Sequence, residues 1–263
     1  RECIPPLHCV ERGAGGEVPM HRFFVETRLD GGEVVLPGHI AHQVTAVLRM
    51  RPGAGLVLFD GSGGEWQAEL LSVGREGARA QLLSHAVPPG REPSIQVILC
   101  QALLKADKVE WILQKGTELG MAAFRPLIMC RTVPVERAAT QGRKLARWRR
   151  IVVEAAEQSG RCTVPAVYPP VPLEVVLREA RATVLCWEDE QTHPFRDAFG
   201  RALAEGDGRV QVIIGPEGGI TPEEVRAAAK AGVHLASLGP RTLRSETAAL
   251  AAAALALLGE AHG

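Results

Sequence analysis

The sequence lacks long apolar runs and paired cysteines. No apolar stretch approaches the roughly 20 residues that a helix needs to cross a bilayer. The most apolar stretch, Ala248–Leu258, is short and rich in alanine, which is typical of a buried helix. The six cysteines stand singly, without a C-x-x-C pair, and this spacing argues against a zinc site and against a disulfide framework. We therefore expect no membrane span, no metal and a reduced, cytoplasmic compartment.

The sequence also has no net charge, because 30 Lys and Arg balance 30 Asp and Glu. The charges are nevertheless unevenly distributed. From Arg131 to Arg161 there are eight basic residues and three Glu, whereas from Glu188 to Asp207 there are six acidic residues and two Arg. Such an asymmetry predicts a basic face for nucleic acid on an otherwise neutral protein. A solvated helix surface without a partner is the alternative.

At 263 residues the chain is long enough for two modest domains or one large one. Residues 1–19 contain no apolar segment typical of a signal peptide, and we interpret them as a disordered or start-site extension. The turn-rich stretch Pro88–Pro93 predicts a linker. Before it, short alternating apolar runs such as Leu56–Phe59, separated by Gly-rich turns, predict a small antiparallel barrel. One helix is expected within the barrel, around Gly38–Leu48.

After Ser94 the pattern changes to apolar runs of strand length that alternate with helical segments. The expected strands are Ile95–Leu99, Phe124–Met129, Thr183–Trp187, Val210–Ile214 and Val233–Leu238. Gly120 is expected to end one helix, and Thr221-Pro222-Glu223-Glu224 has the spacing of a capped helix start. This alternation predicts an α/β fold with a parallel sheet covered on both faces. We expect Trp111 and Trp148, at apolar helix positions, in the core.

Two loops near the C-terminus are the candidates for chemistry. The strand Val210–Ile214 runs into Gly215-Pro216-Glu217-Gly218-Gly219, and the next strand runs into Leu238–Thr247, where two Arg and one Glu precede an Ala-rich helix that Ser245 can cap. Ligands of parallel sheets sit at the carboxyl ends of strands, and glycines there allow close backbone approach. Neither loop has the P-loop or G-x-G-x-x-G pattern. The two loops therefore indicate a small-molecule site, with a plain strand-to-helix turn as the alternative.

A resemblance becomes specific when these loops are taken together. Ile214-Gly215-Pro216-Glu217-Gly218-Gly219, followed by Leu238-Gly239-Pro240-Arg241-x-Leu243-Arg244-x-Glu246-Thr247-Ala248, resembles the knotted SPOUT methyltransferases. Within them the chain is similar to the RsmE type, which methylates N3 of a uridine in 16S ribosomal RNA. Three further stretches match that type. They are His42-x4-Val47-Leu48-Arg49-Met50, Gln114-Lys115-x-Thr117-Glu118-Leu119-Gly120, and the segment from Arg147-Trp148 to Glu157-Gln158-Ser159-x-Arg161.

The resemblance implies a fold and partners that composition alone does not reveal. It implies an N-terminal PUA-like β-barrel for RNA binding, over residues 20–90. It also implies a knotted SPOUT methyltransferase domain with a mostly parallel sheet, over residues 91–263. The trefoil knot is a rare exception to unknotted connections. The implied cofactor is S-adenosyl-L-methionine, and the implied partners are the 16S rRNA of the small ribosomal subunit and a second copy of the chain, which shares the RNA site.

Site residues follow from the same resemblance, as expectations. The expected cofactor-binding residues are Leu185, Gly215, Glu217, Gly219, Leu238, Gly239, Leu243, Arg244 and Thr247. We expect Arg244 to stabilise the developing uridine anion, with Glu217 or Glu246 orienting it; no catalytic base is identifiable. The expected RNA-binding residues are Arg22, Arg49, Lys105, Lys115, Arg131, Arg147 and Arg161, because phosphate contacts supply much of the affinity for nucleic acid.

Three rival hypotheses remain. A Rossmann-type methyltransferase would use Phe59–Gly64 as its glycine loop, but that loop should open a helix, and Trp66, Ala68 and Leu70 alternate as in a strand. A non-catalytic ribosome-associated RNA-binding protein would need only the barrel and the basic segment, and would not bind S-adenosylmethionine. A third possibility keeps the knotted enzyme and changes the target to another RNA base.

Overall fold

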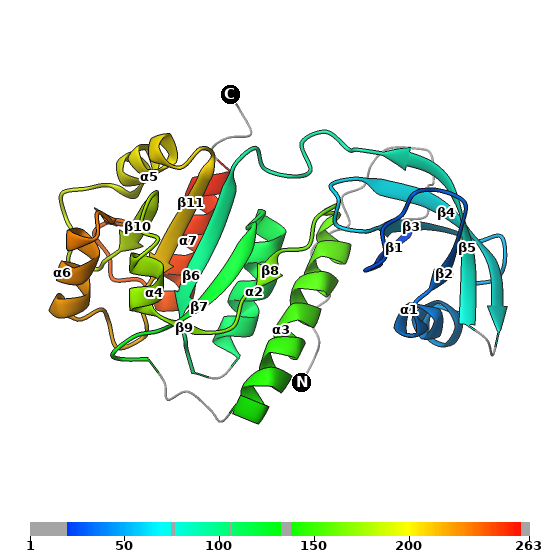
Figure 1. Cartoon of the computed structure of the whole chain (residues 1–263), viewed down its shortest axis with the longest axis horizontal. Coiled ribbons are helices and arrows are strands. Elements are labelled where there is room, and N and C mark those ends of the chain that lie inside the picture. Colours follow the sequence, from blue (N-terminus) through cyan, green and yellow to red (C-terminus); the bar gives the residue numbers. More distant parts are fainter. Residues whose placement is uncertain (1–19, 75–76, 106, 133–137, 259–263) are drawn as a thin grey trace.

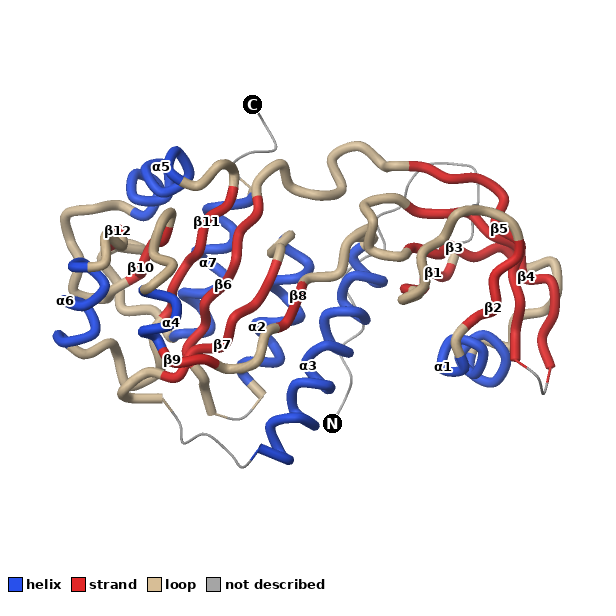
Figure 2. Tube along the Cα trace, viewed as in Figure 1, coloured by secondary structure: helices blue, strands red, loops and turns tan. Residues whose placement is uncertain are grey.

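The computed structural model describes residues 20–74, 77–105, 107–132 and 138–258 (Figure 1). The extension expected over residues 1–19 therefore lies outside the described residues. Two bodies lie side by side along the long axis of the molecule, one built on a five-stranded sheet and one on a seven-stranded sheet (Figure 2). The helix α3 (Ala138–Ser159) runs between them. No helix among the described residues is long and apolar enough to cross a membrane.

The N-terminal body contains the strands β1 (His21–Phe24), β2 (Glu33–Leu36), β3 (Gly55–Phe59), β4 (Glu65–Gly74) and β5 (Gly77–Ala86), in the order β1-β3-β4-β5-β2. The helix expected around Gly38–Leu48 is confirmed as α1 (Gly38–His42) followed by a π-helical turn, Gln43–Val47. The expectation of a purely antiparallel barrel is wrong in one place, because β1 pairs parallel with β3. The long connection through β2 and α1 makes this possible, since parallel neighbours need a crossover rather than a tight turn.

The C-terminal body is the predicted parallel sheet. Its strands are β6 (Gln96–Ala102), β7 (Ala123–Ile128), β8 (Ala166–Val167), β9 (Val171–Pro172), β10 (Thr183–Cys186), β11 (Arg209–Ile214) and β12 (His234–Ala236). They follow the order β12-β10-β11-β6-β7-β8, with β9 beside β7, and every pairing is parallel. The carboxyl ends of neighbouring strands therefore meet at one edge of the sheet, where the two candidate loops begin.

Helices cover both faces of this sheet, as expected. One core packs it against α2 (Lys108–Leu119), α3, α5 (Phe195–Glu205) and α7 (Ser245–Leu257). The other core packs it against α4 (Leu173–Leu177) and α6 (Pro222–Lys230). In α7 the alanines Ala249, Ala252 and Ala253 are fully buried, so the helix backbone lies close to its neighbours. Small side chains thus set the distance between α7 and the sheet.

Several local signals in the sequence are confirmed, and the expectation for one tryptophan is not. Gly120 takes a left-handed conformation (φ +104°) at the end of α2, where an L side chain would be strained. Thr221 and Glu224 form the reciprocal capping box of α6. Trp148 is 2% exposed, as predicted. The expectation for Trp111 is wrong, because its side chain on α2 is 45% exposed and lines a groove against α3.

A buried ion pair closes the junction between the two bodies. The Arg161 guanidinium, on a side chain only 6% exposed, pairs with Glu92 at 2.7 Å and donates to the carbonyls of Thr117 and Met121. Burial would raise the pKa of Glu92, but hydrogen bonds from Arg161 and Thr163 outweigh it and hold the pKa below its ordinary value. The linker is therefore fixed to the end of α2.

The barrel contacts the end of α3 and the turn after it, which contains Arg161. Arg22 pairs with Glu65 inside the barrel, and its other guanidinium nitrogen donates to the Arg161 carbonyl at 3.0 Å. The Phe24 amide donates to the Glu157 carboxylate at 2.9 Å. Burial raises the pKa of Glu157. These contacts join the first barrel strand to the end of α3.

Removal of one partner of the buried pair is expected to destabilise the protein strongly. Arg161→Leu leaves the Glu92 carboxylate and the carbonyls of Thr117 and Met121 without their donor, so the free energy of unfolding should fall by about 3 kcal/mol. The matched control is Arg150→Ala, whose exposed side chain pairs with Glu154 of the same helix and with no other carboxylate among the described residues, and its effect should stay within about 0.5 kcal/mol. Urea unfolding measures both, and equal stabilities would contradict the role given to Arg161.

Candidate functional site

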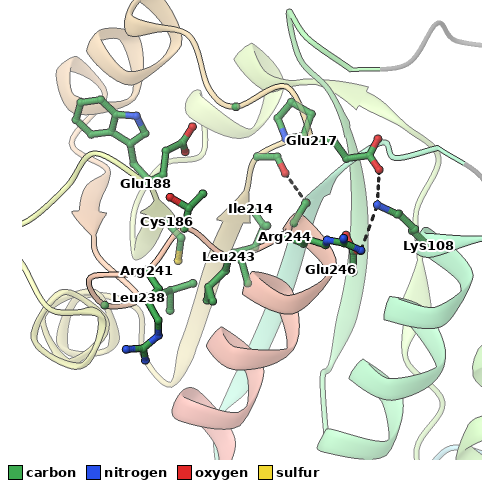
Figure 3. Close-up of a pocket in the computed structure, with 18 residues that line it drawn as sticks. Lys108, Cys186, Glu188, Ile214, Glu217, Leu238, Arg241, Leu243, Arg244 and Glu246 are labelled. Carbon is green, nitrogen blue, oxygen red and sulfur yellow. Dashed lines mark hydrogen bonds and ion pairs between the residues drawn. The ribbon is translucent and has the colours of Figure 1, made fainter.

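A cavity of about 320 Å³ lies at the carboxyl edge of the parallel sheet (Figure 3). One wall is the loop after β11, including Gly215, Glu217 and Gly219. The opposite wall is the segment from Leu238 to Arg244, after β12. The two strands are not neighbours, since β10 lies between them. The floor is therefore supplied by the end of β10, and the cavity spans three strands rather than two.

The residues after β10 are ordered by Glu190. Its Oε1 accepts hydrogen bonds from the Thr192 amide and hydroxyl and from the His193 amide, at 2.5 to 3.1 Å. The Thr192 hydroxyl bond and these amides lower the pKa of Glu190 to about 2, so the carboxylate is charged at neutral pH. The turn that it closes follows Trp187 and Glu188, both of which line the cavity.

Ser245 does not cap α7, contrary to the expectation. It is the first residue of the helix, and Arg244 takes the cap position without a side-chain bond. The Ser245 hydroxyl instead donates to the Gly215 carbonyl at 2.6 Å and accepts from the Gln101 amide at 3.0 Å. The side chain is drawn inward because Gly215 and the end of β6 lie beneath the helix start. One hydroxyl thus joins β6, the loop after β11 and α7.

A lysine bridges two carboxylates at one end of the cavity. Lys108, the first residue of α2, pairs with Glu217 at 2.5 Å and with Glu246 at 3.2 Å (Figure 3). The Lys108 hydrogen bond holds the pKa of Glu217 below its ordinary value, and the bonds to both carboxylates raise the pKa of Lys108. The second oxygen of Glu246 is buried and has no hydrogen-bond partner among the described residues. That oxygen is a free acceptor.

Two arginines of the same cavity have no such partner. Arg241 and Arg244 line it and are exposed. Within the part of the chain that the structure describes, neither guanidinium has a hydrogen bond or an ion pair, whereas Glu217 and Glu246 are both engaged by Lys108. The orientation of Arg244 by one of these carboxylates, expected from the resemblance, thus has no contact supporting it here. Both cations are available to an external anion.

Most of the residues expected to bind the cofactor or act in catalysis line this cavity. They are Gly215, Glu217, Gly219, Leu238, Gly239, Leu243, Arg244 and Glu246. Leu185 and Thr247 do not: Leu185 is buried in the sheet one residue before Cys186, which does line the cavity, and Thr247 is exposed on α7.

Sequence reasoning missed Lys108, Trp187 and Glu188 as lining residues. A topological signal existed for Trp187 and Glu188, because they follow a parallel strand at the same edge as the two loops. Lys108 begins the helix after β6, whose carboxyl end lies at that edge as well.

The basic residues expected to bind RNA fall into separate places. Arg22 and Arg161 are occupied in the junction between the bodies. Arg49 is exposed on the barrel, in a left-handed conformation (φ +52°) after the π-helical turn.

The remaining four lie in two pairs. Lys115 and Arg147 line the groove between α2 and α3, where Lys115 pairs with Glu118 and Arg147 pairs with Glu110. Lys105 and Arg131 line a hollow beside the Pro216–Gly218 wall.

Known proteins share both bodies. A family model described as the RNA methyltransferase domain matches residues 91–257, and one described as the RNA methyltransferase PUA domain matches residues 36–83. Together with the parallel sheet and the cavity at its carboxyl edge, these matches define an RNA methyltransferase with an N-terminal PUA domain. The expected fold class is thereby confirmed, while the trefoil knot stays a prediction.

Curated relatives narrow the class. Ribosomal RNA small subunit methyltransferase E of Mycobacterium bovis is 36% identical over 238 residues, 88% of each chain. The protein of the same name from Bacillus subtilis is 33% identical over 241 residues, which cover 88% of this chain and 93% of the relative. The chain belongs to the ribosomal RNA small subunit methyltransferase E family.

Solved structures agree with this assignment. The crystal structure of ribosomal RNA small subunit methyltransferase E from Neisseria gonorrhoeae, bound to S-adenosyl methionine, has a TM-score of 0.79 and 33% identity, and the match covers 89% of this chain and 95% of that one. A methyltransferase from Legionella pneumophila in complex with the cofactor SAM has a TM-score of 0.77 and 31% identity, with coverage of 91% and 97%.

Loss of the Ser245 hydroxyl is expected to loosen the cavity walls. Ser245→Ala leaves the partly buried Gly215 carbonyl and the buried Gln101 amide without this partner, so the free energy of unfolding should fall by about 1–3 kcal/mol. Ser84→Ala is the matched control, because the exposed Ser84 hydroxyl makes only a 3.5 Å contact with Gln67. Thermal unfolding compares the stabilities of the two variants. If Ser245→Ala is as stable as Ser84→Ala, the Ser245 hydroxyl does not stabilise the cavity walls.

Proposed function

We propose that this protein transfers the methyl group of S-adenosylmethionine to N3 of a uridine in the 16S rRNA of the small ribosomal subunit. The observation that carries the proposal is the cavity at the carboxyl edge of β10, β11 and β12, in a chain of the ribosomal RNA small subunit methyltransferase E family. A relative of 33% identity was crystallised with S-adenosyl methionine bound.

The cavity residues suit the proposed cofactor chemically. Ile214, Leu238 and Leu243 offer apolar surface to an adenine ring. The Glu188 carboxylate is an acceptor for ribose hydroxyls, and the partnerless oxygen of Glu246 is an acceptor for an N–H group. Backbone groups of Gly215, Gly219 and Gly239 are approachable because these residues carry no Cβ. When bound, S-adenosylmethionine supplies an electrophilic methyl group on a sulfonium.

The residues of the chain must then prepare the uridine. N3 lies on the Watson–Crick edge, so the base has to be unpaired or flipped out. Its imide proton has to leave, and the resulting anion must face the methyl group in line, a placement that lowers the barrier by itself. We assign stabilisation of that anion to Arg244, whose guanidinium has no partner among the described residues. Glu217 and Glu246 are paired with Lys108 and not with Arg244.

The two domains and the oligomeric state have proposed roles as well. We propose that residues 20–90 act as the PUA-like RNA-binding domain and residues 91–263 as the knotted methyltransferase domain. We also propose a cytoplasmic homodimer in which both subunits line the RNA site. Leu255 on α7 and Leu258, the residue after this helix, are 37% and 56% exposed, which supports an apolar contact beyond the single chain.

The function is tested by methyl transfer itself. Labelled S-adenosylmethionine is incubated with the protein and either intact small subunits or naked 16S rRNA, and the modified nucleotide is mapped. We expect one product, methylated at N3 of a uridine. Transfer to a different base would keep the assignment as an RNA methyltransferase and change the target nucleotide. Cofactor binding by calorimetry without any transfer to either RNA would overturn the proposed reaction, and absence of cofactor binding would favour an RNA-binding protein without catalysis.

A side chain at Gly219 is expected to weaken cofactor binding. Gly219 has φ +75°, and a Cβ there would lie 2.5 Å from Glu188 Oε1, so Gly219→Ala must push the Glu188 carboxylate out of its position in the cavity. We expect the dissociation constant for S-adenosylmethionine to rise about tenfold. Gly232→Ala is the control, since Gly232 has φ +87° but open space around it and lies outside the cavity. If calorimetry finds equal affinities for S-adenosylmethionine in the two variants, Gly219 is not part of the cofactor site.

Removal of the Arg244 guanidinium is expected to slow the chemical step. Arg244→Ala should lower kcat by about 100-fold, as loss of a group that stabilises developing negative charge does, with S-adenosylmethionine kept at saturation so that a change in its affinity does not enter the rate. Arg201→Ala, an exposed arginine on α5, serves as the control with ordinary turnover. Single-turnover transfer to 16S rRNA measures the step. Near-normal turnover of the Arg244→Ala enzyme would contradict the assignment.

A further inference from the structure

A second hollow adjoins the cavity at the same edge of the sheet. It has a volume of about 380 Å³ and is lined by Leu103, Lys105, Arg131, Thr132 and the Pro216–Gly218 segment. Pro216 and Glu217 line the first cavity too, so one stretch of the loop after β11 separates the two. The first cavity lies over β12, β10 and β11, and the second over β11, β6 and β7, which are neighbours in the sheet.

Arg131 is held in position within this hollow. One of its guanidinium nitrogens donates to the Gly218 carbonyl at 2.9 Å. A Cβ on Gly218 would lie 3.1 Å from the Arg131 Cβ, so the glycine permits the close contact. The turn from Met129 to Thr132 that carries Arg131 is closed by the Thr132 hydroxyl, and its Cys130 amide donates to Glu224 of α6 at 2.7 Å. The guanidinium is therefore oriented before any ligand arrives, with further N–H groups left to donate.

The charge of the hollow is positive. Lys105 is exposed, and its ammonium has no hydrogen bond or ion pair among the described residues. Glu217 is the carboxylate on the shared wall; Lys108 pairs with it from the other side, and the charge of Lys105 also helps to lower the pKa of Glu217. The described lining of this hollow therefore carries two cations, Lys105 and Arg131, against one carboxylate that is already paired with Lys108.

We propose that this hollow binds a backbone phosphate of the RNA next to the target uridine. The inference rests on the proposed function and adds a subsite to it. A flipped nucleotide carries its own phosphates, so a base presented to the first cavity brings a phosphate within reach of the adjoining wall. An oriented guanidinium beside an ammonium matches that group, because arginine offers several donors in a fork and lysine a point charge. The contact positions the strand without reading its sequence.

Salt dependence of RNA binding tests the subsite directly. The full chain is titrated with a 16S rRNA fragment that contains the target uridine, at several salt concentrations, by filter binding. Lys105→Ala and Arg131→Ala should each reduce the slope of log affinity against log salt by about one. The KM for RNA should rise about tenfold, with cofactor affinity unchanged. Arg226→Ala is the matched control, since the ion pair of this exposed arginine within the described part of the chain is with Glu223 of its own helix, α6.

Arg131 also supports the loop after β11 through its bond to the Gly218 carbonyl. Arg131→Lys and Lys105→Ala therefore distinguish support of this loop from binding of phosphate. Arg131→Lys should retain most of the salt slope, and the Lys105 side chain supports nothing else in the described residues. A wild-type slope and KM in Lys105→Ala and Arg131→Ala would overturn the subsite while leaving the proposed methyl transfer intact. Weaker cofactor binding in Arg131→Ala with an unchanged salt slope for RNA would assign Arg131 a structural role only. That result would also overturn the phosphate subsite. Absence of methyl transfer by the wild type would refute the proposed function, and the slopes would still show whether the hollow binds RNA phosphate.

Discussion

One buried hydroxyl sets the width of the cavity. Ser245 donates to the Gly215 carbonyl and accepts from Gln101, so the start of α7, the loop after β11 and the end of β6 meet at a single polar point. A buried group that loses its partner there costs the full desolvation of that group. The alanine face of α7 provides the second half of the constraint, because Ala249, Ala252 and Ala253 let the helix lie flat against the sheet. The walls of the cavity are positioned by this contact and this packing together.

Charge is distributed over the site by one lysine. Lys108 engages both Glu217 and Glu246, so these two carboxylates have a cationic partner other than the arginines of the loop after β12. A site that must hold an anionic base next to a sulfonium needs cations that are not already neutralised. On the far side of the Glu217 wall, Lys105 and Arg131 outnumber the single carboxylate of that lining.

Periodicity and turn chemistry predicted the α/β order, the Gly120 helix end and the Thr221 capping box, because these depend on near neighbours in the chain. The strand order did not follow from the sequence, so the position of β10 between β11 and β12 was not predicted. Trp187 and Glu188 were missed for that reason.

Long-range contacts were missed as well. Ser245 has the residue type of a cap, but its hydroxyl bonds to residues 30 and 144 positions away, which local patterns cannot reveal. Arg22 and Arg161 were expected to bind RNA, whereas Arg22 pairs with Glu65 and donates to the Arg161 carbonyl, and Arg161 pairs with Glu92 of the linker.

The wall shared by the two hollows has an evolutionary consequence. Pro216 and Glu217 face the cavity on one side and the basic hollow on the other, so a substitution in this short stretch alters two binding surfaces at once. A substitution that favours a different ligand in one hollow must therefore also preserve binding in the other. Descendants of such a protein can vary the barrel or the outer helices independently, but the loop after β11 has to change in concert with both sites or remain as it is.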